Sequence, residues 1–256
     1  MLTFYSNKKD FKDSSFSDLF NVNGKTIRSG ANRETLEFLF KNKKYFIKRF
    51  SNGSFLQNIL NKLGFVKHVS NARNEFEAYQ ILKEIGVETA KLVCYGDEKK
   101  FFCNRSFVIS EKIENFEQLD FFFSKAKYRK YHKNHQDQIY KKVVQIINKL
   151  HQNGIVHHDL YLCHFLLDLN SLENNKNIKI YLIDFHRLQK NKKVPSGRLI
   201  KELGDLLFSV KDFANEELFQ EILLSNYDNK NFIETYKLNI QQRAKLMLEK
   251  YKNKYG

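Results

Sequence analysis

The sequence predicts an α+β protein of two unequal lobes, and three observations lead to that prediction. Residues 25–50, 91–96 and 106–110 are rich in β-branched and aromatic residues, which is typical of strands. Beyond residue 115, apolar residues recur at helical spacing over most of the chain. A chain of 256 residues is long enough to bury a core of good size. We expect a β-rich lobe over residues 1–111 and a mostly helical lobe over residues 112–256.

The first lobe is predicted to contain a hairpin and two helices. Residues 35–40 and 45–50 read as strands that flank a polar turn at 41–44. Apolar residues at helical spacing predict helices over 54–63 and 72–85. Gly86 supplies the stop signal of the second helix.

The second lobe is predicted to begin with a long helix that carries an apolar stripe. This stripe consists of Tyr140, Val143, Val144, Ile147 and Leu150. Gly154 follows it and suits a left-handed cap. Residues 166–167 and 178–183 predict a short hairpin around the polar loop 170–177, and further helices are expected over 199–210, 215–224 and 231–251.

The chain is strongly basic, with a formal net charge of +15. No acidic residue occurs between Glu37 and Glu75, and further basic blocks cover residues 125–142 and 187–201. Nucleic acid, an anionic membrane face or a phosphorylated substrate each accounts for such a balance. A solvated, lysine-rich surface accounts for it equally well.

Cysteine use and hydropathy predict a reduced, cytosolic compartment. The three cysteines share no metal-ligand spacing and form no even set. The first residues lack the apolar run of a signal peptide, and no window holds about 18 uninterrupted apolar residues, so a membrane-spanning helix is not expected.

Two short motifs in the second lobe carry the chemistry. Residues 157–164 place Asp159 in a predicted loop, and residues 182–185 place Asp184 at the end of an apolar strand. This is the layout of a kinase catalytic loop followed by a metal-binding aspartate. We predict Asp159 as the catalytic base and Asp184 as a Mg²⁺ ligand. A solvent-facing loop acid and a turn-forming aspartate are the alternatives.

Further site residues are predicted around these two acids. His164 stands where many kinases have a metal-binding Asn, so it is predicted as a metal ligand, with a packed histidine as the alternative. Lys48 lies inside an apolar strand and needs a partner to aim it at the nucleotide phosphates. Glu75 is the expected partner and Glu77 the rival. An exposed strand position for Lys48 is the alternative.

Nucleotide binding is the least complete part of the pattern. No G-x-G-x-x-G occurs, and only Gly24 and Gly30 flank a possible phosphate-covering turn. Glu111 and Ile113, in the segment that joins the predicted lobes, are predicted to contribute to the nucleotide site.

With these residues in place, the chain resembles the lipopolysaccharide kinase family, and within it most closely the branch that phosphorylates core heptose. The most specific matches are Asp-Leu-Tyr-Leu-Cys-His-Phe-Leu-Leu at 159–167 and Ile-Asp-Phe-His-Arg at 183–187. Weaker matches extend from about residue 24 to residue 210, at 35–38, 45–48, 73–78, 86–89, 95–96, 106–109, 150–151 and 154–155.

The resemblance implies a reduced, bilobal protein-kinase-like fold. It implies an enzyme that uses ATP and Mg²⁺ to phosphorylate heptose in the lipopolysaccharide inner core. The place of action would be the anionic cytoplasmic face of the inner membrane of a Gram-negative bacterium, with peripheral attachment. It carries over Asp159 as the base, Lys48 with Glu75 as the nucleotide-positioning pair and Asp184 as the metal ligand, and the family also has a histidine at the position of His164.

Two positions depart from the family pattern, and two segments suggest where the charge acts. His158 stands where Arg is common, and Glu202 stands where a helical Asp is usual.

Residues 55–69, with two lysines, suit an anionic bilayer surface, although packing on the small lobe is at least as plausible. The basic segment 187–201 suits a phosphorylated acceptor.

Three classes of function stay open on the sequence. The first is a kinase for heptose of the lipopolysaccharide core glycolipid. The second keeps the fold and changes the acceptor to Kdo, another sugar or a protein hydroxyl. The third is a degenerate, non-enzymatic binding protein, which the missing Gly-rich loop favours and the joint presence of Lys48, Glu75, Asp159 and Asp184 opposes. No nucleic-acid-binding motif occurs, so nucleic acid is not an expected partner.

Overall fold

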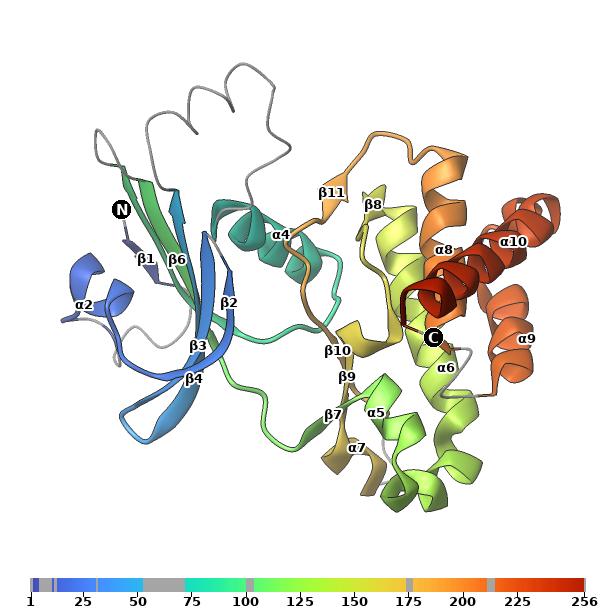
Figure 1. Cartoon of the computed structure of the whole chain (residues 1–256), viewed down its shortest axis with the longest axis horizontal. Coiled ribbons are helices and arrows are strands. Elements are labelled where there is room, and N and C mark those ends of the chain that lie inside the picture. Colours follow the sequence, from blue (N-terminus) through green and yellow to red (C-terminus); the bar gives the residue numbers. More distant parts are fainter. Residues whose placement is uncertain are drawn as a thin grey trace. The chain divides into compact units, whose positions relative to one another are not determined.

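The structure, a computed structural model, describes residues 2–4, 11, 13–30, 32–52, 72–99, 104–173, 177–210 and 215–255. These residues form two units (Figure 1). Unit 1 lies within residues 1–81 and 90–113, and unit 2 within residues 82–89 and 114–256. The predicted lobe boundary at residue 111 falls close to this division, whereas residues 82–89 belong to the unit that contains the C-terminal helices. The predicted helix over 54–63 and the basic stretch 55–69 lie outside the described residues.

Unit 1 is built on one antiparallel sheet of six strands in the order β1-β5-β6-β4-β3-β2. The strands are β1 (Leu2–Phe4), β2 (Lys25–Gly30), β3 (Arg33–Phe40), β4 (Lys43–Asn52), β5 (Leu92–Lys99) and β6 (Asn104–Glu111). The predicted hairpin is confirmed as β3–β4, with Leu36 opposite Ile47. Its turn places Lys41 and Asn42 at positive φ, the conformation that tight hairpin turns require.

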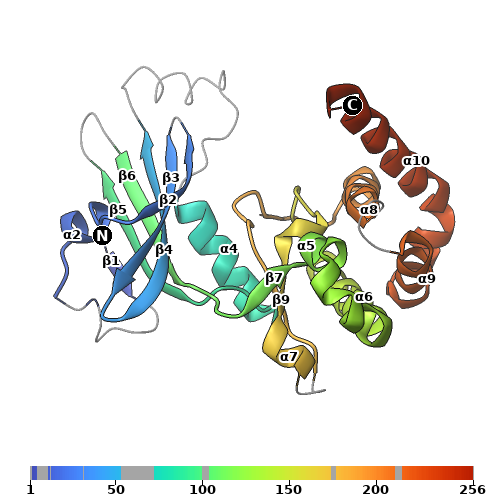
Figure 2. The same ribbon diagram turned by 60° about the horizontal axis from the view of Figure 1, so that its bottom comes forward.

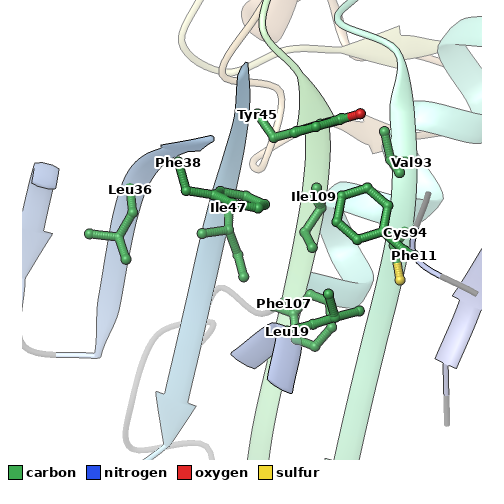
Figure 3. Close-up of a cluster of buried hydrophobic side chains, with 10 residues drawn as sticks. All are labelled: Phe11, Leu19, Leu36, Phe38, Tyr45, Ile47, Val93, Cys94, Phe107 and Ile109. Carbon is green, nitrogen blue, oxygen red and sulfur yellow. The ribbon is translucent and has the colours of Figure 1, made fainter. Parts of the chain in front are cut away.

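Side chains alternate across this sheet and divide its apolar residues into two clusters. Ile47, Phe107 and Ile109 contribute to one cluster, together with Phe11 and with Leu19 from the short helix α2 (Phe16–Phe20) (Figure 3). The other face carries a second cluster that contains Phe50, Ala72, Leu92, Tyr95 and Val108. Helix α4 (Ala72–Glu84), which confirms the predicted helix over 72–85, covers this second face with Phe76 and Tyr79. Lys48 pairs with Val108 across the strands and therefore points to the side of α4.

Unit 2 is mostly helical, as expected. Its main helices are α5 (Leu119–Ser124), α6 (Arg129–Gln152), α8 (Ser196–Val210), α9 (Glu216–Asn226) and α10 (Lys230–Tyr255). α8 packs against α10 and α9 against α6, and Figure 2 shows α8 and α9 beside α10. The predicted stripe of α6 is buried from Tyr140 to Leu150.

Two small sheets bring the loops of unit 2 together. β9 (Phe165–Asp168) lies between β10 (Ile180–Leu182) and β7 (Phe116–Gln118), which confirms the predicted hairpin and adds a third strand. β8 (Ile155–Val156) pairs with β11 (Gln189–Lys190). The polar loop 170–177 was expected to be irregular, but its first part belongs to helix α7 (Leu169–Glu173). No helix among the described residues is long and apolar enough to cross a membrane.

Gly154 is required where α6 gives way to β8. Its φ is +73°, and a Cβ placed there would lie 2.2 Å from the carbonyl oxygen of Asn191. We therefore expect Gly154→Ala to lower the free energy of unfolding by about 2 kcal/mol or more, because backbone strain and a backbone clash add. Urea unfolding followed by circular dichroism measures the change.

Gly197→Ala is the matched control, since a Cβ at this helical position of α8 meets nothing within 4 Å. It should be neutral or stabilise by up to about 1 kcal/mol. Equal unfolding midpoints for the two variants would contradict the role given to Gly154.

Candidate active site

Strand pairing in unit 2 places Asp184 next to the loop that carries Asp159. β10 pairs with β9 in a register that sets Leu182 opposite Phe165. The next amide continues the contact, because Ile183 N donates to His164 O at 2.9 Å. As a result His164 Nε2 and Asp184 Oδ2 are 3.7 Å apart.

The ring of His164 is fixed in one orientation by the loop of residues 157–164, to which it belongs. Its Nδ1 lies 2.6 Å from the carbonyl oxygen of Asp159. A carbonyl oxygen only accepts, so Nδ1 carries the hydrogen, and in the neutral ring Nε2 presents a lone pair. That nitrogen is on the side of Asp184, and the role of His164 as a metal ligand stays a prediction.

Asp184 adopts a left-handed backbone conformation with a φ of +57°. Its Oδ1 accepts a hydrogen bond from His186 Nδ1 at 2.7 Å, and its carboxylate is 22% exposed. The following residue, Phe185, is buried. One carboxylate oxygen is therefore held by a neighbour, while the other faces His164.

A second histidine ties the loop to the peptide before Asp184. His157 is fully buried, and its Nε2 donates to Ile183 O at 3.3 Å. Burial lowers the pKa of His157 to about 4, so the ring is neutral at pH 7. Cys163 is no competing nucleophile, because burial raises the pKa of its thiol to about 11.

Asp159 is half-buried and is paired with Arg187. Nη1 of Arg187 lies 3.0 Å from Oδ1 and 2.9 Å from Oδ2 of Asp159. The Arg187 side chain is 57% exposed, and the Asp159 side chain 25%. Asp159 is therefore reachable from solvent, but both of its oxygens are engaged by one guanidinium nitrogen.

The loop is anchored from beneath by a buried carboxylate on α8. Glu202 is 1% exposed, and its Oε1 accepts the backbone N–H of His158, a residue with a φ of +68°. Its Oε2 lies 2.9 Å from His151 Nε2, and His151 Nδ1 lies 2.8 Å from the Tyr227 hydroxyl. The glutamate at the position of the usual aspartate thus holds the loop directly.

Other side chains of α8 hold the rest of the loop. Ser209 Oγ accepts from Leu162 N at 2.8 Å, and Lys201 Nζ lies 3.5 Å from His158 O. Asp205, buried beneath them, accepts from Lys201 at 2.6 Å and from Arg243 of α10 at 2.7 Å. Three side chains of a helix packed on α10 therefore hold the loop.

His158 is the other departure from the family pattern, and an arginine of α8 lies beside it. His158 Nε2 lies 3.1 Å from Gln189 Oε1, and Arg198 Nη1 donates to the same oxygen at 2.8 Å. Arg198 Nη1 is 3.3 Å from His158 Nε2. A guanidinium is thus present beside the loop, although it comes from α8 rather than from position 158.

In unit 1 the predicted partner of Lys48 is confirmed. Lys48 Nζ lies 2.6 Å from Glu75 Oε1, with the two side chains 22% and 10% exposed. Glu77, the rival, pairs instead with Arg73 on the solvent side of α4 at 2.8 Å. The Lys48 ammonium is therefore held on the face of the sheet that α4 covers.

The two remaining nucleotide-site predictions stay predictions. The backbone N–H of Glu111 donates to Lys91 O at 2.9 Å, and its carboxylate lies 3.3 Å from Lys91 Nζ. Ile113 is the last residue of unit 1 and is half-buried. The contacts of Glu111 hold it at the end of β6, beside Lys91.

Three comparisons with known proteins bear on this site. The model of the lipopolysaccharide kinase (Kdo/WaaP) family matches residues 17–236. The chain belongs to this family. The resemblance inferred from its motifs is confirmed, and so is the predicted enzyme class, a phosphotransferase acting on a sugar hydroxyl.

Curated relatives and a solved structure agree with the assignment. The lipopolysaccharide core heptose(I) kinase WaaP of Escherichia coli K12 is 31% identical over 76% of this chain and 74% of its own length. The enzyme of the same name from Pseudomonas aeruginosa is 27% identical over 84% of this chain and 77% of its own. A structure described as WaaP in complex with acyl carrier protein covers 98% of both chains with a TM-score of 0.76 and 23% identity, which confirms the bilobal kinase-like fold.

We expect Glu202→Asp to lower stability and phosphotransfer together, whereas Glu202→Gln should be better tolerated. The shorter side chain cannot reach both His158 and His151 from α8. Gln keeps both hydrogen bonds if the His151 ring changes tautomer and the Tyr227 hydroxyl turns. The loss for Asp should be about 2–3 kcal/mol in urea unfolding, with a fall in kcat that exceeds the change in KM.

Glu221→Asp, an exposed change on α9, is the control and should stay within about 0.5 kcal/mol of the parent. If Glu202→Asp behaved like Glu221→Asp in both assays, Glu202 would not be the anchor of the loop.

Proposed function

We propose that the protein is an ATP- and Mg²⁺-dependent kinase that transfers the γ-phosphoryl group to a heptose hydroxyl of the lipopolysaccharide inner core. The proposal rests first on membership of a lipopolysaccharide kinase family, whose curated relatives are named heptose(I) kinases. It rests second on one loop that supports both Asp159 and the His164–Asp184 pair.

In this proposal Asp159 orients the acceptor hydroxyl and accepts its proton. The proton leaves as the new O–P bond forms and the bond to the β-phosphate oxygen breaks. A carboxylate offers about four lone-pair sites, and Arg187 occupies two of those of Asp159 in this structure. Such base assistance is typically worth about 10²–10⁴-fold in rate.

Asp184 and His164 are the residues that would hold Mg²⁺. Asp184 Oδ2 and the Nε2 lone pair of His164 lie 3.7 Å apart and face each other. The described residues contain no group of three metal-ligating side chains. Mg²⁺ prefers oxygen ligands, so the Asp184 carboxylate is the donor that fits the ion, and the ring nitrogen of His164 would be the weaker ligand. In kinases Mg²⁺ takes further ligands from nucleotide phosphates and water. When bound, the ion neutralises charge on the phosphates.

Lys48 would contact the nucleotide phosphates while Glu75 fixes its position. Glu75 Oε2 is buried and has no hydrogen-bond partner among the described residues, so the carboxylate stays available to a second donor. In the absence of a Gly-rich motif, the hairpin β2–β3 is the part of unit 1 proposed to cover the phosphates. All six residues of β2 are exposed, and Lys25 and Arg28 supply positive charge there.

The decisive experiment incubates the protein with ATP, Mg²⁺ and core glycolipid that lacks heptose phosphate, and locates any new phosphate by mass spectrometry. We expect transfer to heptose that requires Mg²⁺ and is lost, by about a hundredfold or more, in Asp159→Ala with the fold intact. Asp168→Ala, a change at the end of β9, controls for removal of a carboxylate from the same unit.

Other results of this experiment would change the acceptor, the function or the assignment of the base. Phosphate on Kdo, on another sugar or on protein would keep the fold assignment and replace the acceptor. Nucleotide binding with no transfer to any acceptor would favour a degenerate binding protein. Wild-type turnover in Asp159→Ala would refute the assignment of the base.

We also propose that the enzyme works at the anionic cytoplasmic face of the inner membrane of a Gram-negative bacterium as a peripheral protein. The net charge of +15 supports this, since each basic residue near such a surface contributes about 1 kcal/mol. The last turns of α10 add exposed apolar side chains, with Leu246 52% and Tyr251 51% exposed among Lys245, Lys250 and Lys252. Basic helices with exposed apolar residues are typical of membrane-surface binding.

Sedimentation with vesicles that contain anionic lipid tests this attachment. We expect binding that falls as salt rises, and a loss of about tenfold or more when Lys245, Lys250 and Lys252 are changed to Glu. The same change at Lys41, Lys43 and Lys44 gives the control for net charge. Equal losses in both variants would show that total charge, and not α10, governs attachment.

A further inference from the structure

The segment that follows Asp184 is carried back over the catalytic loop by a two-stranded ladder. β11 pairs with β8 so that Gln189 is opposite Val156, and Asn191 N donates to Gly154 O at 2.8 Å. A turn closed by Leu188 N donating to Phe185 O at 3.0 Å precedes this ladder. Arg187 therefore projects from a fixed turn next to Asp159.

The guanidinium of Arg187 is only partly used by this contact. One nitrogen, Nη1, serves both oxygens of Asp159. Among the described residues, Asp159 is the one ion-pair or hydrogen-bond partner of this side chain, which is 57% exposed. The edge formed by Nε and Nη2, which binds carboxylates and phosphates through two parallel hydrogen bonds, is thus open.

The surroundings of Arg187 favour a negatively charged ligand. The segment 187–201 contains six basic residues and no acidic one. Within it Arg198 is directed to the loop by Gln189 and lies 3.3 Å from the ring of His158, the residue before Asp159. Two arginines therefore lie close to the loop that carries Asp159, and an anion that enters here competes with Asp159 for Arg187.

We propose that Arg187 determines acceptor specificity: it binds an oxyanion of the acceptor glycolipid, a carboxylate or a phosphate, and uncovers Asp159 as it does so. The inference rests on the proposed function and adds to it the charge that the acceptor must carry near its hydroxyl. Without the anion, Arg187 occupies two of the lone-pair sites of the base and the space beside them. With the anion, the same guanidinium holds the acceptor in place.

Three samples of the acceptor and two variants of Arg187 test the proposal. The acceptors are the intact core glycolipid and the same glycolipid with its carboxyl groups converted to methylamides, with a phosphatase-treated sample as a third arm. We expect Arg187→Ala to raise KM for the intact glycolipid about tenfold, the usual effect of losing one charge-assisted contact. If the recognised anion is removed from the acceptor, whether it is the carboxylate or the phosphate, wild type and Arg187→Ala should have the same KM. Arg187→Lys should recover part of the loss, because it keeps the charge without the fork.

The rate of ATP hydrolysis without acceptor shows whether Arg187 shields Asp159 from water. We expect Arg187→Ala to increase it several-fold, because water gains access to the base. Lys237→Ala removes one exposed charge from α10, outside the segment 187–201, and should change neither KM nor hydrolysis. Calorimetric titration with the released core oligosaccharide gives the affinities independently of turnover, and the same acceptor dependence is expected there.

Three results would overturn the inference. An equal fall in kcat on every acceptor with unchanged KM would assign Arg187 to the transferred phosphoryl group. Wild-type behaviour of Arg187→Ala in binding and hydrolysis would make the ion pair incidental. An equal KM increase for Lys237→Ala would reduce the effect to net charge. Failure of the proposed function would be recognised separately, because wild type would then phosphorylate no glycolipid. The titration would still show whether Arg187 binds the oligosaccharide.

Discussion

The geometry of the loop that carries Asp159 depends on one buried carboxylate. Glu202 is almost fully shielded from water, and both of its oxygens must therefore find donors inside the protein. One donor is the His158 amide of the loop, and the other is His151 at the end of α6. Because removing one partner of a buried charge typically costs about 3–5 kcal/mol, the loop, α6 and α8 are fixed relative to one another as a set.

Two residues of the site have strained backbones, and separate contacts hold each of them. His158 and Asp184 are non-glycine residues at positive φ, a conformation that costs about 1–3 kcal/mol each. The strain at His158 is held by Glu202 and by the bond from Lys201 to its carbonyl. The strain at Asp184 is held by the β9–β10 pairing on one side and by His186 on the other. Strained residues flank the proposed base and form the proposed metal ligand because packing elsewhere determines their backbone.

Local pattern was sufficient to predict the elements that carry the site. The β3–β4 hairpin, α4, α6 and the β9–β10 hairpin all have periodicity over enough residues to identify them. Helical geometry also separated Glu75 from Glu77, since the two residues point to different faces of α4. By contrast β1, β7 and α2 span five residues or fewer, too short for a periodic signal, and were not predicted.

The contacts between distant segments could not be predicted in the same way. Arg187 and His151 both stood inside recognised motifs, yet nothing local assigns them to Asp159 and Glu202. The first contact depends on the register of β8 with β11 and the second on the packing of α8 beside α6. The departure at position 202 was visible as a longer acid in place of Asp. Its consequence, a second hydrogen bond to a histidine, required three-dimensional packing.

The pairing of Arg187 with Asp159 invites a simpler explanation, which the geometry argues against. A chain with 44 basic and 29 acidic residues will set a cation beside most exposed carboxylates, and such surface pairs contribute little to stability. An arginine that only neutralised Asp159 would turn its two-nitrogen edge to the carboxylate, as Arg243 does to Asp205 through Nε and Nη2. Arg187 instead contacts Asp159 through a single nitrogen and keeps that edge directed elsewhere. Arg105 also turns its Nε and Nη2 to a carboxylate, that of Glu98. Arg187 differs from both arginines because it lies beside the proposed base with this edge open, which is the arrangement expected of a residue that has a second partner.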